Sequence, residues 1–154
     1  MSYQKLERRL SAINQSGQVD TLSQSKIGIE KESLRVAESG GISQQPHPRA
    51  LGSPLTNPYI TTDFSEALLE MITPPCDSIE QALEFLSDLQ VFIYAHLKEE
   101  ILWATSMPCV VESGDTIPIA QYGKSNVGMM KTIYRRGLGY RYGRTMQVIA
   151  CLLY

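Results

Sequence analysis

The chain has 154 residues, of which 43% are hydrophobic and 19% are charged, a composition typical of one globular domain with its own core. No apolar run approaches the roughly 20 residues that span a bilayer, and residues 1–17 are too polar and charged for a signal peptide. The composition therefore argues against a disordered or membrane-bound chain and predicts a cytoplasmic protein.

The formal net charge of −2 is unevenly distributed along the chain. Residues 1–115 contain all 16 Asp and Glu but only eight Lys and Arg, which gives a formal charge of −8. The remaining six basic residues give the last part a charge of +6; they are Lys124, Lys131, Arg135, Arg136, Arg141 and Arg144. This asymmetry indicates either two surfaces that meet or one surface that receives an anion, such as a nucleotide phosphate, a nucleic acid or an acidic amino acid.

The first predicted element is a surface helix over residues 3–16. Leu6, Leu10 and Ile13 recur at helical spacing with charged residues between them, so we expect this apolar side to pack in the ordinary way. A long loop is predicted over residues 39–58, where Gly and Pro recur and no hydrophobic period is sustained.

Between these segments, residues 26–36 predict a β-strand that carries two carboxylates. Glu30 and Glu32 are two positions apart, so their side chains point to the same side of the strand. Paired carboxylates repel each other, and a hard divalent cation such as Mg²⁺ is their usual partner. The alternative is a solvent-facing Glu-x-Glu pair that binds nothing.

Residues 59–75 bring three more acids, Asp63, Glu66 and Glu70, in a segment rich in apolar residues. The pattern fits a helix or a strand, and in either case Glu66 and Glu70 are expected to share one side. Acids in an apolar segment are costly unless they are paired, solvated or bound to a metal.

Further along the chain, a helix is predicted from Ser78 to about Glu100. Ser78 and Gln81 form a capping box, and a Leu, Phe and Ile stripe keeps the helical period of a core-facing surface. An apolar turn or strand follows over residues 101–109, and a second helix is predicted over residues 128–137.

The remaining residues argue against several other kinds of site. The three cysteines Cys76, Cys109 and Cys151 have neither zinc-site spacing nor the density of a disulfide scaffold, so free thiols are expected. The basic run has interleaved tyrosines, but the sequence pI near 5.7 argues against a nucleic-acid partner. The glycines near residue 140 do not match a dinucleotide fingerprint.

Several longer motifs follow one another in order from about residue 26 to residue 149. They are Gly28-Ile-Glu-Lys-Glu-Ser-Leu-Arg35, His47-Pro-Arg-Ala-Leu-Gly-Ser53, Ile60-Thr-Thr-Asp-Phe-Ser-Glu-Ala-Leu-Leu-Glu70, Leu102-Trp103, Ser106-Met-Pro-Cys109, Ala120-Gln-Tyr-Gly123, Tyr134-Arg135, Arg141-Tyr-Gly143 and Met146-Gln147. Together they resemble the amino-terminal part of bacterial, proteobacterial-type glutamate-cysteine ligase, the γ-glutamylcysteine synthetase.

The resemblance implies an ATP-dependent ligase that joins the γ-carboxylate of glutamate to the amine of cysteine in the first step of glutathione biosynthesis. In that reaction ATP phosphorylates the carboxylate, and the cysteine amine attacks the resulting γ-glutamyl phosphate. Mg²⁺, with Mn²⁺ as an alternative ion, neutralises the charge on the transferring phosphoryl group. The implied partners are small molecules, with no nucleic acid or membrane.

The resemblance also assigns residues to sites. Four acids are implied as metal ligands: Glu30, Glu32, Asp63 and Glu70. Five residues are implied in or near the pocket for the cysteine substrate: Phe64, Tyr134, Arg135, Leu138 and Gln147. No catalytic residue is assigned, and Cys109 matches a family cysteine that can pair with a distant one.

The implied fold is α+β, part of a curved antiparallel β-sheet similar to that of glutamine synthetase, with helices packed on its outer face. On that template the segment around Glu70 is a strand. Residues 1–154 are expected to form a single incomplete catalytic domain, and the full-length enzyme is expected to be a monomer.

One departure from the family falls after Ile149. The family continues there with a segment of the type Gly-x-His-Tyr-Asn that carries another metal-ligand histidine, whereas this chain reads Ala150-Cys-Leu-Leu-Tyr154. Leu153 stands where that histidine would be, which is the pattern expected of a frameshift or premature stop. The alternative function is therefore a non-catalytic remnant that retains a surface for Mg²⁺ and amino acids.

Overall fold

The computed structural model describes residues 3–22, 24–149 and 152–153, and its described strands form one antiparallel sheet in the order β2-β3-β1-β4, with β5 also paired to β1. The strands are β1 Glu30–Val36, β2 Ile60–Thr62, β3 Leu68–Ile72, β4 Ile101–Leu102 and β5 Leu152–Leu153. β1 is central because it pairs with β3 on one edge and with β4 and β5 at opposite ends of the other edge. The α+β fold with an antiparallel sheet is confirmed.

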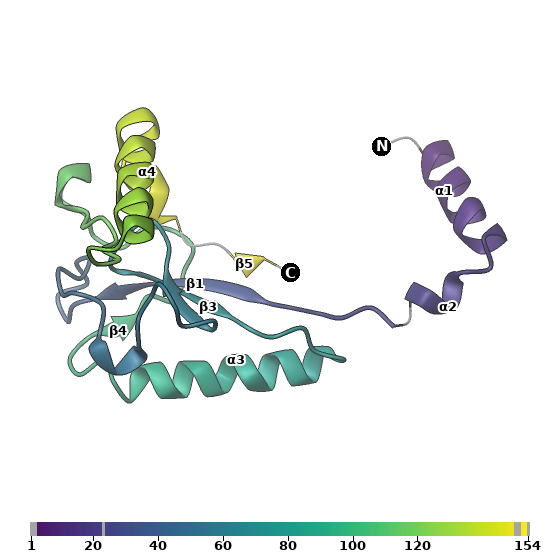
Figure 1. Cartoon of the computed structure of the whole chain (residues 1–154), viewed down its shortest axis with the longest axis horizontal. Helices are drawn as coiled ribbons and strands as arrows, with labels where there is room; N and C mark the ends of the chain where they lie inside the picture. Colours follow the sequence, from purple (N-terminus) through teal and green to yellow (C-terminus); the bar gives the residue numbers. More distant parts are fainter. Residues whose placement is uncertain (1–2, 23, 150–151, 154) are drawn as a thin grey trace.

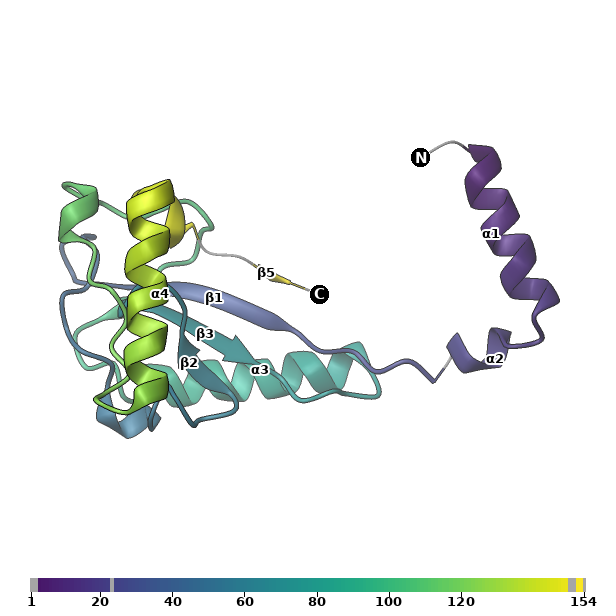
Figure 2. The same ribbon diagram turned by 45° about the horizontal axis from the view of Figure 1, so that its top comes forward.

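The two faces of the sheet are covered differently, because successive side chains of a strand point to opposite faces. Leu69 and Met71 of β3 pack with Leu86 and Ile93 of helix α3, Ile79–Tyr94. Figures 1 and 2 show α3 along that face, and helix α4, Asn126–Tyr142, standing on the opposite side of the sheet. The acids of β1 and β3 lie on the face that α3 leaves open.

Helix α3 starts where its sequence predicts but ends earlier. The Ser78 hydroxyl accepts a hydrogen bond from the Gln81 amide at 3.2 Å, so the predicted N-cap is confirmed. The predicted end near Glu100 is wrong, because the helix stops at Tyr94 and Lys98 has a left-handed φ of 55°. Leu97 still reaches the core from the turn, which explains the continued apolar spacing.

Helix α4 is longer than the predicted residues 128–137 at both ends. Its N-cap is Ser125, whose hydroxyl accepts from the Gly128 amide at 3.1 Å, and Gly143 ends it with φ 80°. Gly128 lies inside the helix, where the backbone of Tyr122 and Gly123 passes close by. A Cβ at this position would overlap the Tyr122 carbonyl and lie 2.9 Å from the Gly123 oxygen, so the close approach requires glycine. This glycine marks close packing and does not mark a helix end.

The amino-terminal helices α1, Tyr3–Gln15, and α2, Val19–Leu22, lie apart from the sheet in Figure 1. The helix predicted over residues 3–16 is confirmed. Its expected packing is wrong, because neither helix has a buried residue and Leu10 is 52% exposed. The apolar stripe has the right period but no facing surface in the described residues.

The loop predicted over residues 39–58 is confirmed, and apart from isolated bridges at Gly41 and Ile42 it forms the short 3-10 helix η1, Arg49–Leu51. Two further 3-10 helices are η2, Gly114–Thr116, and η3, Thr145–Val148. None of the helices within the described ranges is long and apolar enough to cross a membrane.

Candidate functional site

The four acids implied as metal ligands come from two neighbouring strands and the turn between β2 and β3. In the register of β1 with β3, Glu32 lies opposite Glu70 and Glu30 lies opposite Ile72. Asp63 directly follows β2, in the turn that leads into β3. The strand predicted around Glu70 is therefore confirmed, as is the shared side of Glu30 and Glu32, and the register adds Glu70 to that side.

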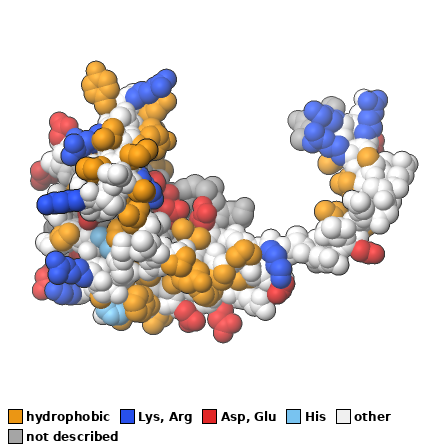
Figure 3. Space-filling view, viewed as in Figure 1, with side chains coloured by type: hydrophobic (Ala, Val, Ile, Leu, Met, Phe, Trp, Pro, Cys, Tyr) orange, Lys and Arg blue, Asp and Glu red, His pale blue; other side chains and the backbone are white. Residues whose placement is uncertain are grey.

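The acids act on one another electrostatically. Burial and, after it, the negative charges of Asp63, Glu30 and Glu32 raise the pKa of Glu70 to about 7, while the Arg135 cation opposes the rise. Figure 3 shows the acidic side chains of this side gathered beside the base of α4. Because neighbouring acids add to the effect of burial on this pKa, negative charge is concentrated on this face.

A divalent cation would relieve that repulsion. Carboxylate oxygens are the ligands that Mg²⁺ prefers, so the donor chemistry of this acidic face fits the ion. Among the described residues, however, no three His, Cys, Asp or Glu side chains converge closely enough to hold a metal as they stand. The side chains would have to close around an ion.

Glu66 does not share the side of Glu70, so that expectation is wrong. Glu66 precedes β3, and its buried carboxylate accepts hydrogen bonds from the His47 amide at 2.9 Å and the Gln121 amide at 2.7 Å. These two hydrogen bonds join two loops. Glu66 is not aligned with Glu70, because strand β3 begins only at Leu68.

The residues implied for the cysteine pocket surround the contact between α4 and the sheet. Phe64 is 1% exposed and packs in the same core cluster as Leu138. A Cβ on Gly139 would lie 3.1 Å from the Phe64 ring, so α4 approaches this ring closely. Tyr134 lies one helical turn before Leu138 and is 65% exposed.

Gln147 lies in η3 beyond the end of α4, next to Val148 of the same core cluster. Its side chain is half-buried. The structure thus brings Phe64 and Leu138 into one core cluster, and neither of the two pockets in the described part of the chain is lined by the residues implied for the cysteine site.

Arg135 joins the basic helix to the acidic face. Its Nε–H donates to the Asp63 carbonyl at 2.5 Å, and its Nη2 lies 3.8 Å from the Asp63 Oδ1. The guanidinium also lies over the Tyr122 ring, 4.7 Å from its centroid. At this contact the acidic and basic parts of the chain meet, as one of the two interpretations of the charge asymmetry expects.

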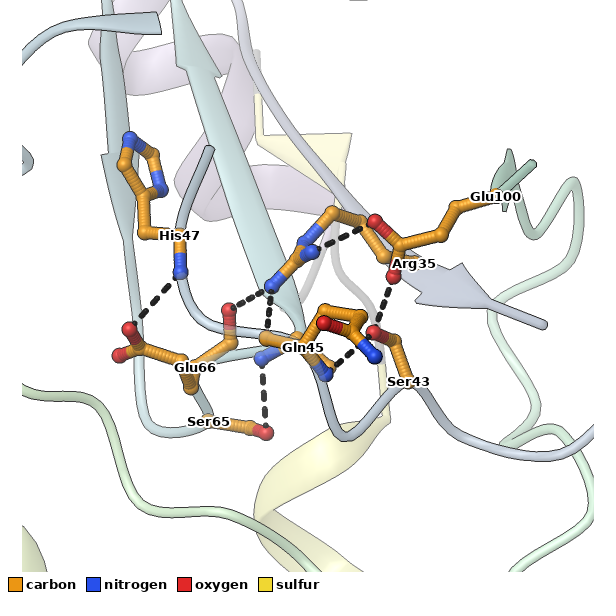
Figure 4. A network of polar contacts seen from close by, with 8 residues as sticks. Arg35, Ser43, Gln45, His47, Ser65, Glu66 and Glu100 are labelled. Atoms are coloured by element: carbon orange, nitrogen blue, oxygen red, sulfur yellow. Dashed lines mark hydrogen bonds and ion pairs between the residues drawn. The ribbon is translucent and has the colours of Figure 1, made fainter. Parts of the chain in front are cut away.

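A second charged network, centred on Arg35, was not predicted from the sequence (Figure 4). The buried Arg35 pairs with Glu100 at 2.8 Å and donates to the carbonyls of Gln45 at 2.8 Å and Glu66 at 2.9 Å. Ser43 donates to the other oxygen of Glu100. The sequence offered no clear signal, because an arginine between the core residues Leu34 and Val36 is also the pattern of a strand with one exposed face.

Two pockets lie at the loop end of the sheet, away from the acidic face. One, of about 960 Å³, is lined by residues that include Arg136 and Arg144. The other, of about 860 Å³, is lined by residues that include His47, His96 and Glu100. Neither includes any of the residues assigned to a site from the sequence.

Cys76 and Cys109 are buried free thiols, as expected, and burial raises the pKa of the Cys109 thiol. Cys151 lies outside the described residues. Leu153, at the departure from the family pattern, is placed by the β5 register opposite Glu30, so the departure falls beside the acidic face.

The structure defines an α+β domain whose antiparallel sheet carries carboxylates on one face, and the comparisons give the particular family. The family model described as glutamate-cysteine ligase matches residues 10–154, and the chain belongs to this family. The match extends through residues 150–154, beyond the last motif that we recognised.

Curated relatives are named glutamate--cysteine ligase. The protein of Alcanivorax borkumensis is 54% identical over 97% of this chain and 28% of its own length, and that of Saccharophagus degradans is 57% identical over 82% and 24%. The chain therefore spans about a quarter of the length of the relatives it matches.

Two solved structures of related enzymes share the fold of this chain. The glutamate-cysteine ligase of Francisella tularensis, solved in complex with AMP, has a TM-score of 0.78 and 46% identity over 81% of this chain and 25% of its own. A bifunctional glutathione synthetase from Pasteurella multocida has a TM-score of 0.77 and 34% identity over 91% and 18%.

Proposed function

We propose that this chain supplies the amino-terminal part of the active site of an ATP-dependent glutamate-cysteine ligase. In this role Glu30, Glu32, Asp63 and Glu70 bind Mg²⁺ or Mn²⁺. Phe64, Tyr134, Arg135, Leu138 and Gln147 form one side of the cysteine pocket. The single observation that carries the proposal is the acidic face, where burial together with the acids of β1 and the β2–β3 turn raises the pKa of Glu70 to about 7 in a chain of this family.

The chemistry of the reaction explains why such a face is useful. Glutamate and ATP are both anions, and their approach is opposed by repulsion unless cations lie between them. Bound Mg²⁺ would supply that positive charge. The protein's part is to hold several carboxylates on one rigid sheet, and Glu32 and Glu70 on paired strands meet this requirement.

Nucleotide as a substrate is supported by the AMP complex of the Francisella tularensis relative. We further propose a cytoplasmic, monomeric protein, since glutamate, cysteine and ATP are metabolites of that compartment. A second candidate, a non-catalytic chain that binds Mg²⁺ and amino acids, is favoured by one observation: the described acids do not converge into a complete metal site.

The test has two measurements on the full 154-residue chain. Calorimetric titration with Mg²⁺ should show binding that Glu32→Gln and Glu70→Gln weaken at least about tenfold. The same change at the exposed Glu84, on α3, removes one charge away from the acidic face and should leave affinity unchanged. Equal affinity in all variants would show that the metal assignment is wrong.

The second measurement separates the two candidates. Phosphate release that requires ATP, Mg²⁺, glutamate and cysteine together supports a ligase. Mg²⁺ binding without any phosphate release supports the non-catalytic chain. The same assay on a full-length relative carrying the corresponding substitutions shows whether the acidic face acts in the complete enzyme.

A further inference from the structure

Tyr122 is a buried polar side chain to which the sequence and the family resemblance assign no role. It lies in the segment before α4 and is 6% exposed. Its hydroxyl donates to the Thr62 carbonyl, lies 3.3 Å from the Asp63 carbonyl, and accepts from the Thr62 hydroxyl at 3.1 Å. One side chain thus holds the backbone at the end of β2, where Asp63 begins the turn.

The ring of Tyr122 holds the other partner of Asp63. The Arg135 guanidinium carbon is 4.7 Å and the Lys131 ammonium nitrogen 4.9 Å from the ring centroid, both within cation–π range. Arg135 donates in turn to the Asp63 carbonyl at 2.5 Å. The Tyr122 hydroxyl therefore holds the backbone at Thr62, directly before Asp63, and the Tyr122 ring supports the guanidinium that holds the Asp63 carbonyl.

This arrangement matters because Asp63 is not in a strand. Its amide is fixed by the Leu68 carbonyl at 3.1 Å, and its carbonyl depends on the two contacts just described. Glu32 and Glu70 are positioned by the β1–β3 ladder, but Asp63 has no such ladder. Its carboxylate can join theirs only if the turn is held in place.

We propose that Tyr122 is a positioning residue for the acidic face: it fixes the Asp63 carboxylate beside Glu70 by holding the Asp63 backbone and Arg135. The proposal rests on the proposed function, in which Asp63 is a metal ligand. Tyr122 itself is not a ligand in it, and it acts through Asp63 alone.

The first variant is Tyr122→Phe, which removes the hydroxyl and keeps the ring. Arg135 stays over the ring, so its repulsion of a cation is unchanged and a change in affinity reports the position of Asp63. Calorimetric titration of the full chain should give Mg²⁺ affinity about tenfold weaker than wild type, the usual size for loss of an outer partner of a ligand. Unchanged or tighter affinity would overturn the proposal.

The matched control is Tyr59→Phe. Tyr59 makes an edge contact with Phe85 of α3, on the opposite face of the sheet from the acids, so this variant should bind Mg²⁺ like wild type. A Tyr122→Phe protein that melts earlier but binds Mg²⁺ with wild-type affinity would show a purely structural role and refute the positioning role.

A second readout needs no metal. The coupling constants between Hα and Hβ of Asp63, measured by NMR without Mg²⁺, should show one fixed side-chain rotamer in wild type and an averaged one in Tyr122→Phe. Equal couplings in the two proteins would refute the proposal. If wild type fails to bind Mg²⁺, the metal part of the proposed function is wrong, and the couplings still decide whether Tyr122 positions Asp63.

Discussion

Strand β1 carries two groups of charges that differ in how they are compensated. At its carboxyl end, buried Arg35 meets one carboxylate of opposite charge and two carbonyls. At its amino end, Glu30 and Glu32 face Glu70 and Asp63, and Arg135 is the cation of α4 that offsets them. A charge that meets opposite partners lowers the energy of the fold, whereas like charges held close together raise it unless a cation binds.

Glu66 and Glu70 show the same contrast over four residues. Glu66 accepts hydrogen bonds from two backbone amides, whereas burial and the neighbouring like charges raise the pKa of Glu70 to about 7. Substitutions that remove charge should therefore have opposite effects at the two ends of this part of the sheet.

The largest effect is expected at Arg35. Arg35→Ala leaves Glu100 without its cation and two carbonyls without a donor, so unfolding free energy should fall by about 3 to 5 kcal/mol. Urea unfolding followed by circular dichroism measures the loss. Arg49→Ala, at an exposed position, is the control and should change stability by less than about 0.5 kcal/mol. If Arg35→Ala lowered the unfolding free energy no more than Arg49→Ala, the compensated charges at the carboxyl end of β1 would not stabilise the fold.

The next effect is expected from Glu66→Gln. One carboxylate oxygen becomes an amide nitrogen, so either the His47 or the Gln121 backbone amide then faces another donor. The unsatisfied amide should cost about 2 kcal/mol, measured in the same urea experiment. Glu84→Gln changes an exposed acid of α3 in the same way and should leave stability unaltered, which separates the buried contact from the loss of charge alone.

The same substitution at Glu70 should have the opposite sign. Because the folded-state pKa is raised from 4.5 to about 7, the folded protein keeps a proton that the unfolded chain releases, and wild-type stability falls as pH rises through this interval. Glu70→Gln removes that dependence. At pH 8 it should be more stable than wild type by about 1 to 2 kcal/mol, allowing for solvent screening, and near pH 4 the two should agree.

Thermal unfolding of both proteins across this pH range measures the difference. Saturating Mg²⁺ should stabilise wild type at pH 8 and have little effect on Glu70→Gln, because an ion that binds only the folded state adds its binding free energy. A Glu70→Gln protein less stable than wild type at pH 8 would mean that Glu70 is already compensated.

The acidic face could be largely predicted from the sequence, since the side-chain period of a strand places Glu30 and Glu32 together and the family motif adds Asp63 and Glu70. The Arg35 network could not, because its partners Ser43, Gln45 and Glu100 lie in loops whose paths depend on the whole fold. Hydrogen bonds to backbone carbonyls leave no pattern in the side chains.

Element boundaries show the same limit. The low helix propensity of glycine predicts a helix boundary at Gly128, yet this residue lies inside α4. Glycine is needed there because the helix crosses the Tyr122 and Gly123 backbone too closely for a Cβ. Leu97 continues the period of α3 but belongs to the turn that follows. Periodicity reports which residues are buried and does not distinguish a helix from a turn that buries the same side.

The smallest effect is expected from the helix that makes no core. Leu10 of α1 is 52% exposed, so Leu10→Ser should change the unfolding free energy of this chain by less than about 0.5 kcal/mol. Leu86→Ser on α3 is the matched change in a buried position and should cost more than about 3 kcal/mol. Urea unfolding of both compares them directly. A large loss at Leu10 would show that the α1 stripe is buried in solution, and that the period of Leu6, Leu10 and Ile13 reports a real contact.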